Sequence, residues 1–185
     1  LKDIYASVLI KDIVKRNSLR DVDMLERIIA YTIKNVGCTF SANSLALYLK
    51  SEHRRASIDT VINYLNACEK AFLFYRISRN DLEAKKILKI NEKYYLADHG
   101  IRQALYGDNQ YDIGIVLENI VCLELLRQGY KVSVGKVGEK EIDFVCEKNG
   151  KLLYVQVCYL LASEKTKERE FSVYDNIKDN YPKYV

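Results

Sequence analysis

Apolar residues in the first 70 positions recur at steps of three and four, which predicts amphipathic helices. Three helices are expected, at residues 21–34, at 41–50 and from Ser57 to Cys68, and residues 11–17 predict a further amphipathic helix. Gly37 follows the first of them as a stop signal, and Ser41 or Asn43 and then Ser57 are suitable N-caps for the other two.

Two strand-like runs follow these helices. Residues 72–77 and 89–96 are rich in aromatic and β-branched side chains, and the polar stretch 79–86 separates them. Three helices followed by a strand, a loop and a second strand match the plan of a winged helix-turn-helix. In that plan the helix from Ser57 is the recognition helix and residues 79–86 form the wing.

The second half shows a different order of elements. Residues 115–128 have a strong helical period, with an apolar stripe formed by Val116, Ile120, Val121, Leu125 and Leu126. Strand-like segments follow at 130–134, 141–146 and 152–158, with a hairpin turn at 147–151, and residues 166–177 are helical again. This order predicts the start of a restriction-endonuclease-like core.

The fold class is therefore predicted as α+β, with a helical winged helix-turn-helix followed by a nuclease-like α/β domain. Residues 106–114 are polar, turn-rich and bounded by glycine, so we expect a domain boundary there. The expected domains are residues 1–110 and residues 111–185. The second is expected to lack its last strand, because the chain stops at Val185.

Composition and charge exclude several functional classes. The 185 residues carry 29 basic and 25 acidic side chains, and the formal net charge is +4. Five scattered cysteines and two histidines give little material for a disulfide framework, a zinc site or a Ser-His-Asp triad. No nucleotide-binding glycine loop, long apolar run or signal peptide is present in the sequence, which predicts a cytoplasmic protein without a membrane contact.

Residues 47–95 are the basic part of the chain, with a net charge of +4, whereas residues 96–185 carry a net charge of −2. Arginine, lysine and asparagine reach phosphates and base edges. The expected nucleic-acid-binding residues are those before, on and after the recognition helix: Arg54, Arg55, Asn63, Lys85 and Lys86. Asp59 and Glu69 on the same helix would repel DNA, so a protein-docking role is the alternative.

Three residues of the second half occupy the positions of a nuclease site. Asp143 lies on the second strand, Glu118 on the preceding helix, and Gln156 where nucleases of this fold have an acidic residue. Carboxylates at adjacent strand ends share Mg²⁺, and a lysine steadies the attacking water and the phosphate. Glu118 and Asp143 are expected to bind Mg²⁺ only if the site is active.

The lysine of this site is missing, because Cys158 stands at its position in the third strand. Lys140, Lys165 or Lys167 are the candidates for a replacement. Glu141 precedes Asp143 by two residues and therefore points to the same face of the strand.

Several spaced segments resemble one known group of proteins. They are KDIVKR at 11–16, KYYLAD at 93–98, LEN at 117–119, EIDF at 141–144, YVQV at 154–157 and YPK at 181–183. In this order they resemble the C-terminal region of prokaryotic AAA-type ATPases, whose tail is a domain of unknown function. The resemblance covers essentially the whole chain.

The resemblance implies a winged helix followed by a PD-(D/E)XK-like domain, and an ATPase module that precedes Leu1 and carries the ATP site. In that group a glutamine commonly stands at the third-strand position and the lysine is commonly missing, which implies a degenerate fold that binds without cutting. Because the sequence also lacks an initiator methionine, we expect it to be part of a larger protein.

One function and two alternatives are therefore expected from the sequence. The first is a recognition module of an ATPase that binds nucleic acid without catalysis and needs no cofactor of its own. The alternatives are a Mg²⁺-dependent DNA endonuclease and a protein-docking module of a defence-type system.

Overall fold

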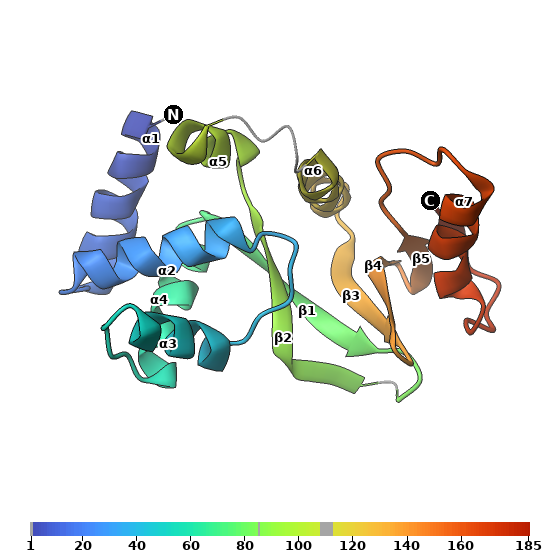
Figure 1. Ribbon diagram of the computed structural model, residues 1–185, viewed down its shortest axis with the longest axis horizontal. Helices are drawn as coiled ribbons and strands as arrows, with labels where there is room; N and C mark the ends of the chain where they lie inside the picture. The colour runs from blue at the N-terminus through green and yellow to red at the C-terminus, as the bar shows by residue number, and fades with distance from the viewer. Residues whose placement is uncertain (1, 85, 108–112) are drawn as a thin grey trace. The chain divides into compact units, whose positions relative to one another are not determined.

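The computed structural model of the protein describes residues 2–84, 86–107 and 113–185, and it shows an α+β fold with a mixed sheet (Figure 1). The chain forms two compact units. The first unit contains residues 1–76 and 94–109, and the second contains residues 77–93 and 110–185. The boundary predicted at residue 110 lies outside the described residues. No helix of the described ranges is long and apolar enough to cross a membrane.

Helices dominate the first unit. They are α1 (Lys2–Ser7), which continues into the π-helix η1 (Val8–Lys15), then α2 (Val22–Lys34), α3 (Ala42–Ser51), α4 (Ile58–Lys70) and α5 (His99–Tyr106). Helices α2, α3 and α4 pack on one another. The three helices expected here from the apolar period are confirmed.

Each of these three helices begins at a side chain that accepts a main-chain N–H of its first turn. Asp21 accepts from Met24, and Ser57 accepts from Thr60. Ser41 forms a reciprocal capping box with Ser44, so it is the cap of α3 and Asn43 is not. The apolar stripes then bury large side chains, which include Leu25, Ile28, Leu45, Val61 and Leu65.

Strands β1 (Phe74–Asp81) and β2 (Lys86–Leu96) are longer than expected, and both run from one unit into the other. In the second unit β1 pairs in parallel with β3, with Arg79 opposite Val134. The hairpin tip also belongs there, because the N–H of Leu82 donates to the carbonyl of Lys136. The loop predicted at 79–86 is thus shorter than expected, since β1 continues to Asp81 and its residues Arg79 to Asp81 pair with β3 in the second unit.

The second unit continues with one helix, three strands, a helix and a short strand. They are α6 (Ile113–Arg127), β3 (Lys131–Val137), β4 (Lys140–Lys148), β5 (Lys151–Val155), α7 (Glu164–Phe171), the 3₁₀ turn η3 (Ser172–Tyr174) and β6 (Lys183–Tyr184). The strand order of the sheet is β2-β1-β3-β4-β5-β6. Strands β3, β4 and β5 are antiparallel, and β6 is parallel to β5.

The predicted hairpin between the last two long strands is confirmed. Asn149 and Gly150 both have positive φ angles, of 52° and 72°, as a tight turn of this kind requires. A short last strand follows in the described chain, where Lys183 and Tyr184 pair with Tyr154 and Val155.

The apolar stripe predicted on α6 is confirmed in part, because Leu125 is buried and Val116, Val121 and Leu126 are half-buried. Asn119, Cys122 and Leu125 are its buried residues, whereas Ile120 of the predicted stripe is 51% exposed. The helix is apolar on nearly every side, so its sequence does not show which face the sheet covers.

An irregularity in β4 decides which side chains share a face of the sheet. The register with β3 shifts between Ser133, opposite Val145, and Gly135, opposite Ile142. Ile142 and Val145, three residues apart, therefore join the same apolar cluster, with Val137, Tyr154, Val173 and Tyr174. Asp143 is left on the side of Glu118 from α6, and the site is built there.

Candidate functional site

Three carboxylates of the second unit surround one lysine. The Lys93 Nζ atom lies 2.9 Å from Glu118 Oε1, 2.9 Å from Glu141 Oε1 and 3.9 Å from Asp143 Oδ1. We call these four residues the carboxylate cluster. All of them belong to the second unit, with Lys93 on β2, Glu118 on α6 and the other two on β4.

The carboxylate cluster is largely shielded from water. The side chain of Lys93 is 5% exposed, and those of Asp143 and Glu118 are 14% and 16% exposed. A second cation adjoins it, because Arg79 Nη2 lies 3.2 Å from Glu141 Oε2. Buried charges remain ionised only when opposite charges and hydrogen bonds replace their water, and the cluster meets that condition.

The pKa values of two members are displaced. Burial acts to lower the pKa of Lys93, but the negative charges of Glu118, Glu141 and Asp143 outweigh it, so the pKa is raised and the amine stays protonated. Burial, and next the charge of Glu118, raises the pKa of Asp143 to about 6. Such shifts in a compact group of charges are typical of functional sites.

Asp143 is also tied to the segment that follows β5. The N–H of Asp143 donates to Gln156 Oε1 over 3.1 Å, and the N–H of Val157 donates to Asp143 Oδ2 over 2.8 Å. These two hydrogen bonds extend the pairing of β4 with β5 past Val155, the last residue of β5. They hold Asp143 in one position against the cluster.

The amide of Gln156 explains why an acidic residue is absent at this position. Its Nε2 donates to Glu170 Oε2 over 3.3 Å, and Arg169 binds the other oxygen of Glu170. A glutamate at 156 would accept from Asp143 equally well, but it would place a second carboxylate against Glu170. Gln156 is therefore suited to link β4 with α7.

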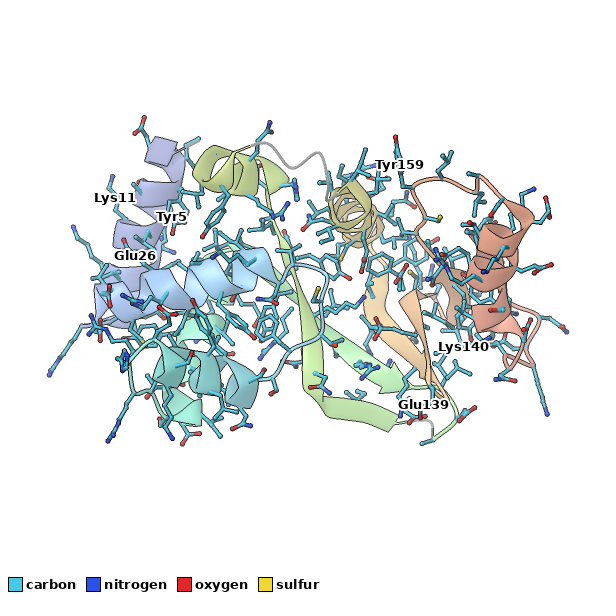
Figure 2. All side chains as sticks on the ribbon, viewed as in Figure 1. Tyr5, Lys11, Glu26, Glu139, Lys140 and Tyr159 are labelled. Atoms are coloured by element: carbon cyan, nitrogen blue, oxygen red, sulfur yellow. The ribbon has the colours of Figure 1, made fainter. Side chains whose placement is uncertain are left out.

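Among the described residues, the three lysines expected to replace the missing one have their ion pairs and hydrogen bonds outside the carboxylate cluster or are exposed. Lys140, labelled in Figure 2, lies at the start of β4. Its Nζ donates to the carbonyl and the hydroxyl of Ser172. Lys167 pairs with Glu164 on its own helix, and Lys165 is exposed on the same helix. Cys158 lies beyond β5, with its Sγ 3.5 Å from the carbonyl oxygen of Leu160.

Sequence reasoning found Glu118, Asp143 and Gln156 and missed the two cations. The sequence pattern places Lys93 in a strand and in one of the resembling segments, and Arg79 in the wing, without assigning either to the site. The signal that could have found Lys93 is a charge within an otherwise apolar strand end, since Tyr94, Tyr95 and Leu96 are all buried beside it.

The carboxylate oxygens suit a hard cation such as Mg²⁺ by their chemistry, but they are not gathered closely enough to hold one. In the described part of the chain, no three His, Cys, Asp or Glu residues form a group that could hold a metal ion. Glu118 and Asp143, the predicted metal ligands, face the ammonium of Lys93 instead.

A hollow of the second unit lies elsewhere. It has a volume of about 690 Å³ and is lined by residues of the hairpin, the sheet and the segment after η3, among them Val145, Leu152 and Tyr154. No member of the carboxylate cluster lines it. The cluster therefore does not form the floor of this cavity.

The predicted nucleic-acid-binding residues are divided between exposed positions and the undescribed part of the chain. Arg54, Arg55 and Asn63 are exposed in the first unit. Arg54 Nη2 lies 2.8 Å from Asp23 Oδ2 on α2, so its charge is partly balanced. Lys85 and the side chain of Lys86 lie outside the described residues.

A polar hollow runs beside α4, the predicted recognition helix. Its volume is about 370 Å³, and its lining includes Thr60, Asn63, Asn66 and Lys70 of α4 with Asn17. Asn66 is engaged by Arg76, whose Nη1 donates to its Oδ1. This face of α4 therefore presents amide, hydroxyl and ammonium groups.

Comparison with known proteins gives a family and two curated relatives. The family is described as a domain of unknown function (DUF8612), and its model matches residues 1–112. An uncharacterized protein of Haemophilus influenzae is 39% identical over 185 residues, which cover 100% of this chain and 46% of that protein. An uncharacterized protein of Methanocaldococcus jannaschii is 30% identical over 97% of this chain and 40% of its own length.

The chain spans less than half the length of either relative. No solved structure gives a significant match. The family model includes Lys93 but ends before the three carboxylates of the cluster, which the full-length alignments with the two relatives include. The chain belongs to the DUF8612 family.

Proposed function

We propose that this chain is a nucleic-acid recognition module in which the second unit is a nuclease-like domain that does not cut. Binding is assigned to the exposed basic and polar side chains around α4. The carboxylate cluster is assigned a structural and electrostatic role.

The order of elements supports the nuclease-like assignment. From α6 to β6 the chain runs helix, three antiparallel strands, helix and a strand parallel to the third. Glu118, Asp143 and Gln156 stand at the helix, second-strand and third-strand positions at which nucleases of this kind carry their site. The shift of register in β4 keeps Asp143 on the α6 side of the sheet.

The main support for a domain without catalysis is that oxygens expected to bind a metal accept hydrogen bonds from other groups of the chain. Lys93 Nζ donates to Glu118 Oε1, the N–H of Val157 donates to Asp143 Oδ2, and the N–H of Asp143 donates to Gln156 Oε1. A metal ion would have to displace an ammonium with strong Coulombic ties, and the cost of breaking a buried ion pair is large.

The surface around α4 supports binding of nucleic acid. Arg54 and Arg55 precede the helix, and Asn63 and Lys70 line its polar hollow. These side chains donate to phosphate oxygens and base edges. Asp59 on the exposed side of α4 and Asp23 beside Arg54 act against it, so we expect an affinity in the micromolar range and a strong dependence on salt.

An association with an ATPase is part of the same proposal. It is supported by the resemblance of the spaced segments to the C-terminal region of AAA-type ATPases. It also agrees with curated relatives more than twice as long as this chain. ATP would then bind outside this sequence, which has no phosphate-binding glycine loop.

Fluorescence anisotropy with labelled duplex and single-stranded DNA, from about 50 to 200 mM salt, tests the proposal. We expect binding that weakens steeply with salt and weakens about tenfold or more in Arg54→Ala plus Arg55→Ala. Lys165→Ala plus Lys167→Ala removes the same charge from α7 and serves as the matched control. Binding that ignores salt or the arginine pair would contradict the proposal, and no binding at all would favour a protein partner.

A Mg²⁺-dependent nuclease is the second candidate, and Lys93 is the observation that favours it. The cluster does contain a lysine beside Asp143, although it comes from β2 and not from the third strand. A gel of the same DNA samples after incubation with Mg²⁺ or Mn²⁺ decides between the two. Intact DNA supports the binding module, whereas cleavage that disappears in Asp143→Ala would establish the nuclease.

A further inference from the structure

The cavity of about 690 Å³ in the second unit is built on two cross-strand rows of β3, β4 and β5. One row contains Ser133, Val145 and Tyr154, and the next contains Lys131, Glu147 and Leu152. Val145 and Tyr154 belong to the apolar cluster on the face of the sheet away from Asp143. Proteins bind small molecules in hollows of about 300–1,000 Å³, so this cavity has the size of a ligand site.

The tip of the β1–β2 hairpin forms one wall of the cavity, and a glycine of β3 makes room for it. The N–H of Leu82 donates to the carbonyl of Lys136 over 2.9 Å. A Cβ atom on Gly135 would lie 3.3 Å from Leu82 Cδ1 and 2.7 Å from Val145 Cγ2, so position 135 has no space for a side chain. Glycine at this position lets Leu82 approach the sheet and close this side of the cavity.

The segment after η3 forms another wall of the cavity. The Tyr154 hydroxyl donates to Asp179 Oδ2 over 2.6 Å, and the N–H of Ile177 donates to the carbonyl of Tyr174 over 2.9 Å. Ile177 in this wall and Leu152 on the floor are half-buried apolar side chains. The floor and both walls are therefore held by hydrogen bonds and packing of the second unit, as in a site that is largely formed before a ligand binds.

One buried oxygen of the lining lacks a hydrogen-bond donor. Asn80, from β1, donates through its Nδ2 to Ser133 Oγ over 2.9 Å, and Ser133 donates in turn to the carbonyl of Val145. The Oδ1 atom of Asn80 is buried and accepts no hydrogen bond from the described part of the chain. A buried acceptor without a partner costs stability, so a ligand that donates an N–H or O–H to this atom forms a hydrogen bond that the free protein lacks.

The charges around the cavity favour an uncharged ligand. The exposed charges of the lining have both signs, and they are Lys131, Lys178, Glu83 and Glu147. The half-buried carboxylates already accept hydrogen bonds, Asp81 from Ala84, and Asp179 from Tyr154 and Lys183. Among the lining residues, those that are buried carry no charge. A charged ligand would therefore lose its water at the floor without gaining a counter-ion there.

We propose that this cavity binds an uncharged, largely apolar small molecule that donates an N–H or O–H to Asn80 Oδ1. The apolar part of the ligand contacts Val145, Leu152 and Ile177, and its donor completes the chain of hydrogen bonds that runs from Asn80 through Ser133. This binding is additional to the recognition of nucleic acid proposed above, because the residues that line the cavity belong to the second unit and α4 belongs to the first.

Indole and benzofuran are the probes that test the proposal, because they have nearly the same size and shape and differ in the ring heteroatom. Indole donates an N–H, whereas the oxygen of benzofuran only accepts. Titrations followed by the amide chemical shifts of the protein in two-dimensional NMR spectra give the Kd of each probe. We expect a Kd of about 1 mM or lower for indole, with shifts at Ser133 and Val145, and a Kd about three- to tenfold higher for benzofuran.

Two variants test the floor and the acceptor separately, each with a matched control. Leu152→Phe fills part of the cavity and should raise the Kd of both probes by about tenfold, whereas Leu160→Phe makes the same change at an exposed residue outside the lining and should leave both Kd values unchanged. Asn80→Leu removes the acceptor and should bring the two Kd values within about twofold of each other. Asn180→Leu, at an exposed residue outside the lining, should keep the difference.

The two probes are compared on the unmodified protein, so the result holds even if a variant fails to fold. Tighter binding of indole, with shifts that map to the hairpin tip and to β3, β4 and β5, supports the proposal. No binding of indole at millimolar concentration overturns it. Equal Kd values for the two probes, shifts confined to residues outside the cavity, or an unchanged Kd in Leu152→Phe would overturn it as well.

Discussion

The carboxylate cluster and the surface of α4 both contain ion pairs, but those of the cluster are mostly buried and those beside α4 are exposed to solvent. In the cluster, Lys93 is 5% exposed and meets three carboxylates. Beside α4, the side chains of Arg54 and Asp23 are 46% and 47% exposed and form a pair at 2.8 Å. The first set of charges has lost most of its water, whereas the second keeps it.

The difference shows what each region can do. A buried charge that loses its partner is left without water or a counter-ion, so the cluster is sensitive to every substitution. An exposed pair contributes little to stability, and either member can exchange its partner for a ligand at small cost. The cluster is thus suited to hold the second unit together, and the α4 surface is suited to bind.

The largest effect is expected when one carboxylate is removed from the cluster. Glu118→Ala should lower the free energy of unfolding by about 3 kcal/mol, because the buried Lys93 loses one of its two closest partners. Glu124→Ala, on the exposed side of the same helix, is the matched control and should leave stability unchanged. Urea denaturation of both variants measures the difference. If both variants lost the same free energy of unfolding, burial would not make the charges of the cluster more important for stability than exposed charges.

The pH dependence of stability gives the next largest effect. Burial raises the pKa of Asp143 to about 6, whereas a carboxyl of the unfolded chain titrates near 4. Between these values the native state binds more protons than the unfolded state, so the contribution of Asp143 to stability falls as pH rises from about 4 to 6 and is constant above.

Asp143→Asn removes this titration. The free energy of unfolding of Asp143→Asn, relative to the unmodified protein, should therefore increase by about 2 kcal/mol between pH 4 and 7. Denaturation midpoints at four or five pH values provide the measurement. A difference that stays constant with pH would show that Asp143 titrates as in the unfolded chain.

Gln156→Glu should have a smaller effect of about 1–2 kcal/mol at pH 7, because it replaces a hydrogen bond to Glu170 with a repulsion. The loss should shrink toward pH 4, where the new carboxyl becomes protonated. Gln128→Glu is the control, since Gln128 also donates to a glutamate, Glu124, but at the exposed end of α6. Thermal unfolding of both variants at pH 7 and pH 4 would show whether the loss of stability depends on the burial of the substituted side chain.

The smallest effect concerns the exposed pair beside α4. Asp23→Asn should release Arg54 and raise the affinity for DNA by roughly two- to fivefold at low salt. Asp3→Asn changes the net charge equally on α1 and should have little effect. Anisotropy titrations compare the two variants. An unchanged affinity for Asp23→Asn would place the binding surface away from Arg54.

The sequence by itself determined the local features of this protein. Asp21, Ser41 and Ser57 cap helices through contacts with residues three positions away, and Asn149 and Gly150 form a turn from their own backbone preferences. Such interactions lie within a few residues, so the order of residue types is enough to predict them.

Only the tertiary structure decided the composition of the site. Lys93 and Glu118 are 25 positions apart, and no periodicity relates them. The buried face of α6 is set by the sheet, because its own sequence is apolar all round, and the register shift in β4 depends on its pairing with β3. Glu118 and Asp143 could be named as candidates, but their common partner is a lysine brought to them by β2.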